Sequence, residues 1–283
     1  MPIRIFNNIP SLTTQRLLGT NNEELGQSFS RVASGTRITK SADDAAGLAI
    51  SEALFSDTRA LKQGGKNLGD GMSMVKTAEG ALNEQAGILL RLRELASQAA
   101  TGTIGQNERD TIQLEFDSLR KELDRIANTT EFNGQKLLDG SLAATALNNV
   151  HIQIGLNSGQ DNRISINAEA DLTASSSSGL GIASASVDTQ TNALSAMTNL
   201  TDAVRTLSVK RAKVGALQNR FEKALSNINV SVENLMAAQA GIKDADMAEE
   251  FARLTRSEIL VQSAAAMVGQ SNLIPQGVLQ LLR

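Results

Sequence analysis

Three groups of side chains have types and spacings that could support chemistry. Asp43 and Asp44 are adjacent carboxylates, as in a general acid–base pair, but they begin a predicted helix, where negative charge is favoured without any active site. His151 is the only histidine and has no nearby histidine or cysteine to complete a metal site. The glycines from Gly64 to Gly71 follow no strand and lack the Gly-Lys-Ser/Thr ending of a phosphate loop. We therefore predict no catalytic residue, no metal and no cofactor, and a protein that is not an enzyme.

The composition indicates long helices packed through aliphatic side chains. The 283 residues are 41% apolar but include only seven Phe and no Trp or Tyr, which argues against a broad aromatic core. The three prolines, Pro2, Pro10 and Pro275, lie near the ends, so the interior is free of the strongest helix breaker. A net charge of -3 and the few aromatic residues exclude nucleic acid as an expected partner.

Neither end of the chain has the sequence features of a signal peptide or of a membrane span. Residues 1–10 lack the basic and apolar regions of a cleaved signal. The most apolar stretch, residues 259–282, is interrupted by glutamines, an asparagine and a proline. We expect no membrane insertion and, if the protein is exported, a route without a cleaved signal. The absence of cysteine is compatible with either side of a cell envelope.

Heptad patterns occupy both halves of the chain and predict coiled-coil seams. In the N-terminal half, apolar residues recur every seven positions at Leu54, Leu61, Leu68, Val75, Leu82, Leu89 and Ala96. In the C-terminal half, a similar row contains Met197, Leu200, Val204, Leu207, Val214, Phe221, Leu225, Ile228, Val232 and Leu235. We predict a mainly α fold: a long antiparallel, coiled-coil-like helix bundle formed by the N- and C-terminal halves, with a small β-hairpin region in the middle.

Local signals give the expected elements and domains. Helices are predicted at about 3–35, 43–100, 107–127 and 188–242 and from 247 onward, the first ending at Gly35 because glycine accepts the left-handed conformation. Alternating residues at 150–154 and 164–167 predict a β-hairpin inside a hairpin region at about 131–172. Residues 173–186, rich in Ser, Ala and Gly, predict an exposed loop that packs against nothing. We expect an inner domain of residues 1–44 plus 245–283 and a middle domain of 45–244.

The last helix carries more apolar surface than one partner helix can cover. One stripe includes Phe251 and Leu254, and a second, offset around the helix, includes Leu260 and Met267. A helix that is apolar on several sides lies inside an assembly or a membrane, so we predict self-assembly, with residues before about 44 and after about 245 becoming helical only on assembly. The residues assigned to this surface are Leu18, Leu25, Phe29, Val32, Phe251, Leu254, Leu260, Met267, Ile274, Val278 and Leu281.

Several motifs, in order along nearly the whole chain, resemble those of bacterial flagellins. The N-terminal motifs are residues 33–38 (Ala-Ser-Gly-Thr-Arg-Ile), 43–47 (Asp-Asp-Ala-Ala-Gly), 77–82 (Thr-Ala-Glu-Gly-Ala-Leu) and 91–96 (Arg-Leu-Arg-Glu-Leu-Ala). The later motifs are residues 131–134 (Glu-Phe-Asn-Gly), 218–221 (Gln-Asn-Arg-Phe), 242–246 (Ile-Lys-Asp-Ala-Asp) and 275–283 (Pro-Gln-Gly-Val-Leu-Gln-Leu-Leu-Arg).

The resemblance implies a structural subunit that polymerises through its terminal helices into the helical flagellar filament, a motility propeller. Residues 140–186 leave little room for inserted outer domains, so inner and middle layers alone are expected. The resemblance also implies unfolded export through the flagellar type III channel, assembly at the distal tip and a secreted, extracellular location. Implied partners are other flagellin subunits, an export chaperone at the C-terminal segment, and the hook–filament junction and filament cap proteins.

Two further implications concern particular residues. Arg91, Leu95 and Glu115 match the surface that a flagellin-sensing Toll-like receptor recognises in related proteins, although a solvated helix face with local ion pairs explains them equally well. The resemblance places a switch between packing registers near the hairpin. The glycines between Gly64 and Gly71 are a second candidate switch, with close helix approach as the simpler explanation.

Three alternatives share part of the pattern. A hook–filament junction protein has the same paired ends, but the motifs at 218–221 and 278–283 favour the filament subunit. A generic coiled-coil scaffold explains the heptads and not the ordered motifs. An enzyme of the filament surface needs an inserted catalytic domain, and the chain has no segment that fits one.

Overall fold

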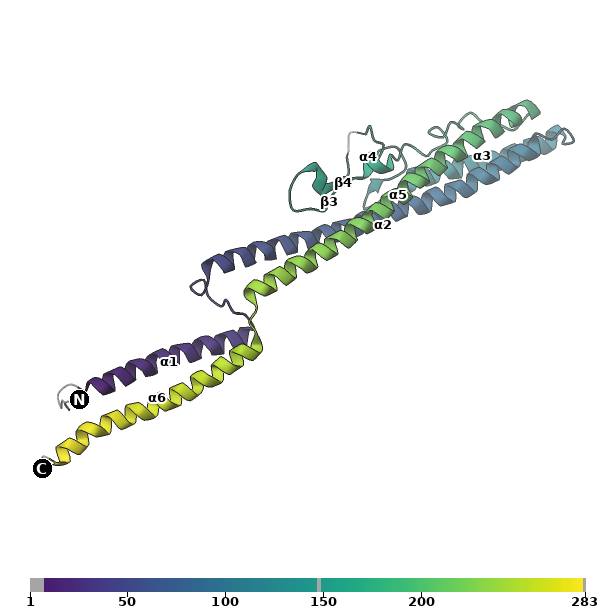
Figure 1. Ribbon diagram of the computed structural model, residues 1–283. Helices are drawn as coiled ribbons and strands as arrows, with labels where there is room; N and C mark the ends of the chain where they lie inside the picture. The colour runs from purple at the N-terminus through teal and green to yellow at the C-terminus, as the bar shows by residue number, and fades with distance from the viewer. Residues whose placement is uncertain (1–7, 147–148, 282–283) are drawn as a thin grey trace. The chain divides into compact units, whose positions relative to one another are not determined.

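The computed structural model describes residues 8–146 and 149–281, with side chains described as far as Leu273. Its helices are α1 (Ile9–Ser34), α2 (Ala45–Ala99), α3 (Gln106–Thr129), α4 (Ile166–Ala170), α5 (Gln190–Lys243) and α6 (Met247–Leu281), together with a short 3-10 turn, η1 (Gln160–Asn162). Its strands are β1 (Glu131–Phe132), β2 (Gln135–Lys136), β3 (His151–Gln153) and β4 (Arg163–Ser165). The mainly α prediction is confirmed (Figure 1).

The chain forms two compact units. The terminal unit comprises Met1–Ser56 and Asn234–Arg283, and the middle unit comprises Asp57–Glu233. These boundaries fall within α2 and α5, whereas the predicted division of 1–44 plus 245–283 from 45–244 follows the joints between helices. That division concerns the layers of an assembly and stays a prediction.

In the middle unit, α2 packs antiparallel to both α3 and α5. Arg109 near the start of α3 donates to the carbonyl oxygen of Ala99 at the end of α2 (3.0 Å), and Gln218 of α5 donates to Glu79 of α2 (2.6 Å). The α2 heptad is confirmed from Leu68 to Ala96, because its five members are buried. The antiparallel bundle of the two chain halves is therefore present.

The seam of α5 differs from the predicted row in register. Its buried residues are Ala193, Ala196, Leu200, Ala203, Leu207, Lys210, Val214, Leu217, Phe221 and Ile228. The predicted row shares the members at every seventh position. At the alternate positions it named Met197, Val204 and Leu225, whereas the structure buries Ala196 and Ala203 and partly buries Ala224. Met197 and Val204 lie partly buried beside the seam and Leu225 is 36% exposed. Small alanines allow the helices to approach closely, so the larger side chains lie at the flank.

Two short hairpins follow α3, of which the first was missed as a hairpin. In β1–β2, Phe132 pairs with Gln135, and the turn residues Asn133 and Gly134 both have positive φ (50° and 79°). Such a turn is the two-residue hairpin connection that an Asn-Gly pair favours. The Asn-Gly dipeptide was therefore a usable signal in the sequence.

The predicted second hairpin is confirmed in β3–β4. Ile152 pairs with Ile164, and exposed His151 pairs with Ser165. The second strand ends earlier than predicted, because Ser165 caps α4 by accepting a hydrogen bond from the Ala168 backbone N–H (3.4 Å). The prediction of a strand at Ile166 is therefore wrong.

The prediction that residues 173–186 pack against nothing is wrong. The Ser-rich segment, defined here as residues 173–187, has no helix or strand, yet Ser175, Ile182 and Val187 are fully buried. Two backbone hydrogen bonds fix its path. The Ser175 N–H donates to the Leu138 carbonyl (2.9 Å), and the Ile182 N–H donates to the Ser177 carbonyl (2.8 Å). Sparse apolar residues among serines gave no periodic signal, so composition alone misled the prediction.

Close packing explains two of the glycines in α2. A Cβ atom at Gly64 would lie 2.5 Å from the carbonyl oxygen of Ile154, and one at Gly71 would overlap the side chain of Ile152. Nothing lies within 4 Å of a Cβ at Gly69. Gly64 and Gly71 therefore do mark a close approach, but the nearest neighbour is the β3 region of the hairpin rather than the helix expected from the sequence.

These glycines give a matched pair of variants. We expect Gly64→Ala to lower the free energy of unfolding by about 2 kcal/mol, because the obstructing atoms belong to backbone and the hairpin must shift. We expect Gly69→Ala to raise it by up to about 1 kcal/mol, since alanine favours the helix and meets no obstacle. Urea unfolding of the monomer measures both, and equal effects of the two changes would contradict the close-approach explanation.

Candidate self-assembly surface

Within the terminal unit, α1 and α6 lie side by side as an antiparallel pair (Figure 1). At one end the Asn8 side chain donates to the Ser271 carbonyl (3.0 Å), and at the other Arg31 pairs with Glu250 (3.2 Å). The covered positions of α1 are Ser11, Thr14, Leu18, Asn21, Leu25, Ser28 and Val32. Those of α6 are Glu250, Leu254, Ser257, Val261, Ala264, Val268 and Ser271. Both rows keep steps of three and four, and their buried members are polar: four serines and Glu250.

Large apolar residues remain outside the seam between the two helices. Phe29 is 65% exposed, Met267 59% and Leu260 42%. Leu260 and Met267 are seven residues apart and so share one side of α6. The pair of terminal helices therefore presents an uncovered apolar surface.

The residues predicted for self-assembly fall into three groups. Leu18, Leu25, Val32 and Leu254 are half-buried within the α1–α6 seam. Phe29, Phe251, Leu260 and Met267 are exposed. The side chains of Ile274, Val278 and Leu281 lie outside the described residues.

Sequence reasoning missed other exposed apolar side chains on the same two helices. They are Ile9, Leu12 and Leu17 on α1 and Ile259 and Leu273 on α6. Each lies off the predicted stripes, so periodicity gave no signal for it. They enlarge the uncovered surface.

The connections between helices in the terminal unit are bonded to each other through their backbones. The Ala245 N–H donates to the Gly35 carbonyl (3.1 Å) and the Arg37 N–H to the Lys243 carbonyl (2.7 Å). Thr36 and Asp244 form an antiparallel bridge between these two bonds. Gly35 permits this path because it adopts φ 70° at the end of α1.

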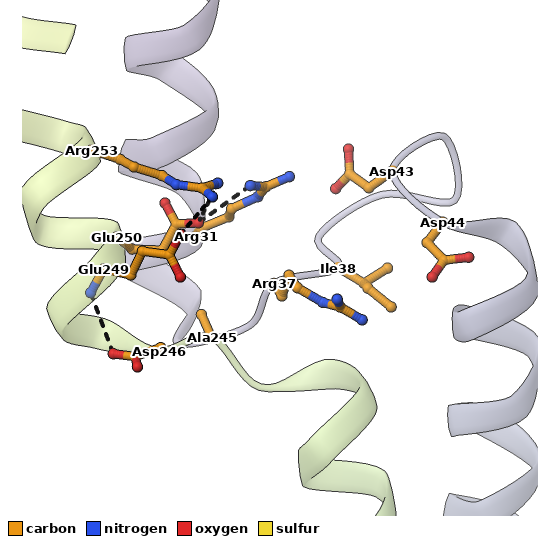
Figure 2. A pocket seen from close by; sticks show the side chains of 10 residues that line it. All are labelled: Arg31, Arg37, Ile38, Asp43, Asp44, Ala245, Asp246, Glu249, Glu250 and Arg253. Carbon is orange, nitrogen blue, oxygen red and sulfur yellow. Dashed lines mark hydrogen bonds and ion pairs between the residues drawn. The ribbon is translucent and has the colours of Figure 1, made fainter. Parts of the chain in front are cut away.

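A polar cavity of about 400 Å³ lies beside this connection (Figure 2). Buried Glu250 accepts from Arg31, and exposed Glu249 pairs with Arg253 (2.7 Å). One Glu250 oxygen, Oε2, is buried without a hydrogen-bond partner. Arg31 and Arg253 pair with Glu249 and Glu250, and among the described residues no group of three or more acidic, His or Cys side chains is arranged to hold a metal ion.

Asp43 and Asp44 at this cavity have separate structural roles. Asp44 accepts from the Gly47 backbone N–H (2.8 Å) at the start of α2. Asp43 accepts from the backbone N–H groups of Thr39 (3.0 Å) and Lys40 (3.1 Å), and these bonds, with the Thr39 hydroxyl, hold the pKa of its carboxyl below the ordinary value. Asp44 therefore lies at the start of α2 as predicted, whereas Asp43 closes the turn before it, which was not expected from the sequence.

The residues predicted for receptor recognition lie on α2 and α3. The Arg91 guanidinium donates to Glu115 from Nε (3.0 Å) and Nη2 (2.8 Å), and its hydrogen bonds to Glu115 and Glu94 raise its pKa. Leu95 is buried in the core, so its side chain lies beneath this exposed pair. Leu90 and Leu114, which the sequence did not single out, are the exposed leucines next in sequence to Arg91 and Glu115.

Comparison with known families gives a match over most of the chain. Residues 5–143 match the bacterial flagellin N-terminal helical region, and residues 197–282 match the bacterial flagellin C-terminal helical region. The chain belongs to the bacterial flagellin family. This flagellin is accordingly a structural component of the flagellar filament and not an enzyme.

Similar proteins match this flagellin from end to end. A flagellin of Halalkalibacterium halodurans is 41% identical over 99% of both chains. A flagellin of Bacillus subtilis is 42% identical over 99% of this chain and all of its own. The flagellar filament 30.7 kDa core protein of Treponema maltophilum is 38% identical over 98% of this chain and 99% of its own. The crystal structure of Bacillus cereus flagellin, 30% identical, covers 62% of this chain and 94% of its own with a TM-score of 0.49.

None of the described helices combines the length and the apolar character that crossing a bilayer demands.

Proposed function

We propose that this flagellin polymerises through the exposed faces of α1 and α6 into a helical filament that acts as a motility propeller. The observation that carries the proposal is the uncovered apolar surface, above all Leu260 and Met267, which remain exposed after α1 and α6 have paired. Soluble monomers rarely leave large contiguous apolar patches in water, and such patches mark interaction sites. A second copy of the same chain is the occupant that family membership supports.

Within the filament, residues 1–44 and 245–283 form the inner layer and residues 45–244 the middle layer. The two family matches leave only residues 144–196 between them, and α4, the β3–β4 hairpin and the Ser-rich segment occupy much of that stretch. A subunit without outer domains follows. Electron microscopy of protein polymerised from filament seeds tests the proposal: long tubular polymers with two layers support it, and short capped assemblies or solitary subunits contradict it.

The helices α1 and α6 gain their stability from neighbouring subunits. Their mutual seam buries mainly serines and half-buried aliphatic side chains, which provides little hydrophobic stabilisation for two helices of 26 and 35 residues. We expect amide hydrogen exchange at Leu25 and Met267 to be fast in the monomer and slow in the polymer. Equal protection in both states would show that the pair is stable alone.

Export and assembly of this flagellin involve further protein partners. The chain is exported unfolded through the flagellar type III channel, held beforehand by a chaperone on its C-terminal segment, and added at the distal tip beneath a cap, beyond a hook–filament junction. The full sequence contains no cysteine that could cross-link during such passage. Copurification of the chaperone with the full chain, and its loss when residues 247–283 are removed, tests the first of these contacts.

Recognition by a flagellin-sensing Toll-like receptor involves Arg91 and Glu115, which lie together on the surface. Leu95 supports their helices from the core and offers no exposed side chain. A receptor reporter assay on Arg91→Ala and Glu115→Ala tests this role, with Arg125→Ala as a control that breaks an exposed ion pair elsewhere on α3. An equal response to all three variants would contradict it.

A further inference from the structure

Lys210 occupies a position in α5 that is otherwise reserved for apolar side chains. It lies between Leu207 and Val214 in the buried seam row and is only 4% exposed. A buried ammonium loses the hydration that stabilises its charge. Its presence in the seam therefore needs partners inside the middle unit.

Those partners belong to the Ser-rich segment. The Lys210 Nζ donates to the carbonyl oxygens of Thr173 (3.0 Å) and Ala174 (2.8 Å) and to the Ser175 hydroxyl (3.2 Å). All three ammonium donors are thus used, and all three acceptors are uncharged. The nearest carboxylate along this stretch, Asp171, is bound instead by Lys213 (2.9 Å).

The other two helices hold the same stretch. Gln85 of α2, fully buried, donates from Nε2 to the Ser175 carbonyl (3.2 Å). Asp124 of α3 accepts from the Ser177 backbone N–H (2.6 Å) and hydroxyl (2.8 Å). One polar side chain from each of three helices therefore clamps the start of the segment.

We propose that Lys210 is a protonation-dependent latch, which holds the Ser-rich segment against the helices more tightly as a neutral amine than as an ammonium. The neutral amine keeps two N–H donors for the carbonyls of Thr173 and Ala174, and its lone pair accepts the Ser175 hydroxyl proton. Deprotonation therefore keeps the three hydrogen bonds. It removes the free-energy cost of burying a charge that has no bonded counter-ion.

The pKa values fix the direction and the pH window. Burial lowers the pKa of Lys210 to about 8, although the charge of Asp171 raises it and that of Lys213 lowers it further. Asp124, the charged group on α3 that holds the segment, is engaged by Ser177. When the segment opens, Lys210 enters water and regains the ordinary pKa of 10.5. The closed state then binds fewer protons, so it gains stability as pH rises from about 8 to 10.5 and changes little below pH 8.

Hydrogen exchange of the full-length monomer tests the latch. Between pH 7.5 and 9.5, after correction for intrinsic exchange, we expect the opening equilibrium at the Ser175 and Ile182 amides to fall about twentyfold. In Lys210→Met it should not change with pH, whereas Lys223→Met, which removes an exposed amine of the same helix, should keep the fall. The same pH dependence in Lys210→Met and the parent chain overturns the proposal.

A measurement without substitution covers the case in which Lys210→Met does not fold. Carbon NMR of the lysine side chains in the parent monomer should show one signal with a pKa of about 8, which is that of Lys210. The exposed lysines should titrate at higher pH. A signal set in which every lysine titrates together near its ordinary value overturns the proposal. Neither experiment involves polymer, so the latch and the assembly surface succeed or fail separately.

Discussion

Replacing Leu260 and Met267 together by glutamine is expected to raise the critical concentration for polymer growth by about two orders of magnitude. Leu260 is 42% and Met267 59% exposed in the single chain, and the proposed interface would bury both. Losing this burial removes about 3 kcal/mol from the association free energy of each subunit, which corresponds to roughly a hundredfold change. Light scattering during seeded growth at graded protein concentrations measures the effect.

The matched control changes exposed polar residues of the same helix. Gln262→Ala together with Gln270→Ala keeps α6 helical and leaves both apolar side chains in place. We expect its critical concentration to remain within a few-fold of the parent chain. If both double variants polymerised like the parent, this side of α6 would lie outside the assembly interface.

Phe221→Ala is expected to lower the free energy of unfolding of the middle unit by about 4 kcal/mol. The ring is fully buried in the seam of α5, and one of its edge atoms lies 3.4 Å from the position that a Cβ at Gly71 would occupy. Removing the ring leaves a cavity between α5 and α2 beside Gly71. The two helices cannot move close enough to fill this cavity. Urea denaturation followed by circular dichroism measures the loss.

Leu225→Ala, four residues along the same helix, is the control. This side chain is more than a third exposed, so its truncation should lower the free energy of unfolding by about 1 kcal/mol or less. A loss as large as that of Phe221→Ala would mean that α5 uses the originally predicted seam, with Leu225 inside it.

Periodicity predicted most of the helices and their antiparallel pairing. The α2 heptad from Leu68 to Ala96 marks a buried stripe because a row of large aliphatic residues is a strong signal. The α5 row was one residue off at alternate positions, since Ala196 and Ala203 look less hydrophobic than Met197 and Val204. Close packing selected the smaller side chains, and apolar size alone could not reveal this choice.

Other features depend on tertiary contacts that local sequence does not encode. The burial of the Ser-rich segment follows from single contacts such as Ile182 in the core and Lys210 beneath Ser175. Nothing in the sequence around Lys210 distinguishes it from Lys213, which is only partly buried. Within the terminal unit, the sequence identified exposed Leu260 and Met267 but assigned Leu18 and Leu25 to the same surface, although both are half-buried against α6.

The backbone bonds between Gly35 and Ala245 and between Arg37 and Lys243 have a mechanical consequence. Two separate linkers would bend and stretch independently, whereas bonded linkers share any load as one two-stranded ribbon. Tension along α1 or α6 then acts on these bonds in shear, so they must rupture together rather than one after another. A propeller subunit that is turned from one end gains from such a connection, because torsion entering through either helix is carried by both strands of the ribbon.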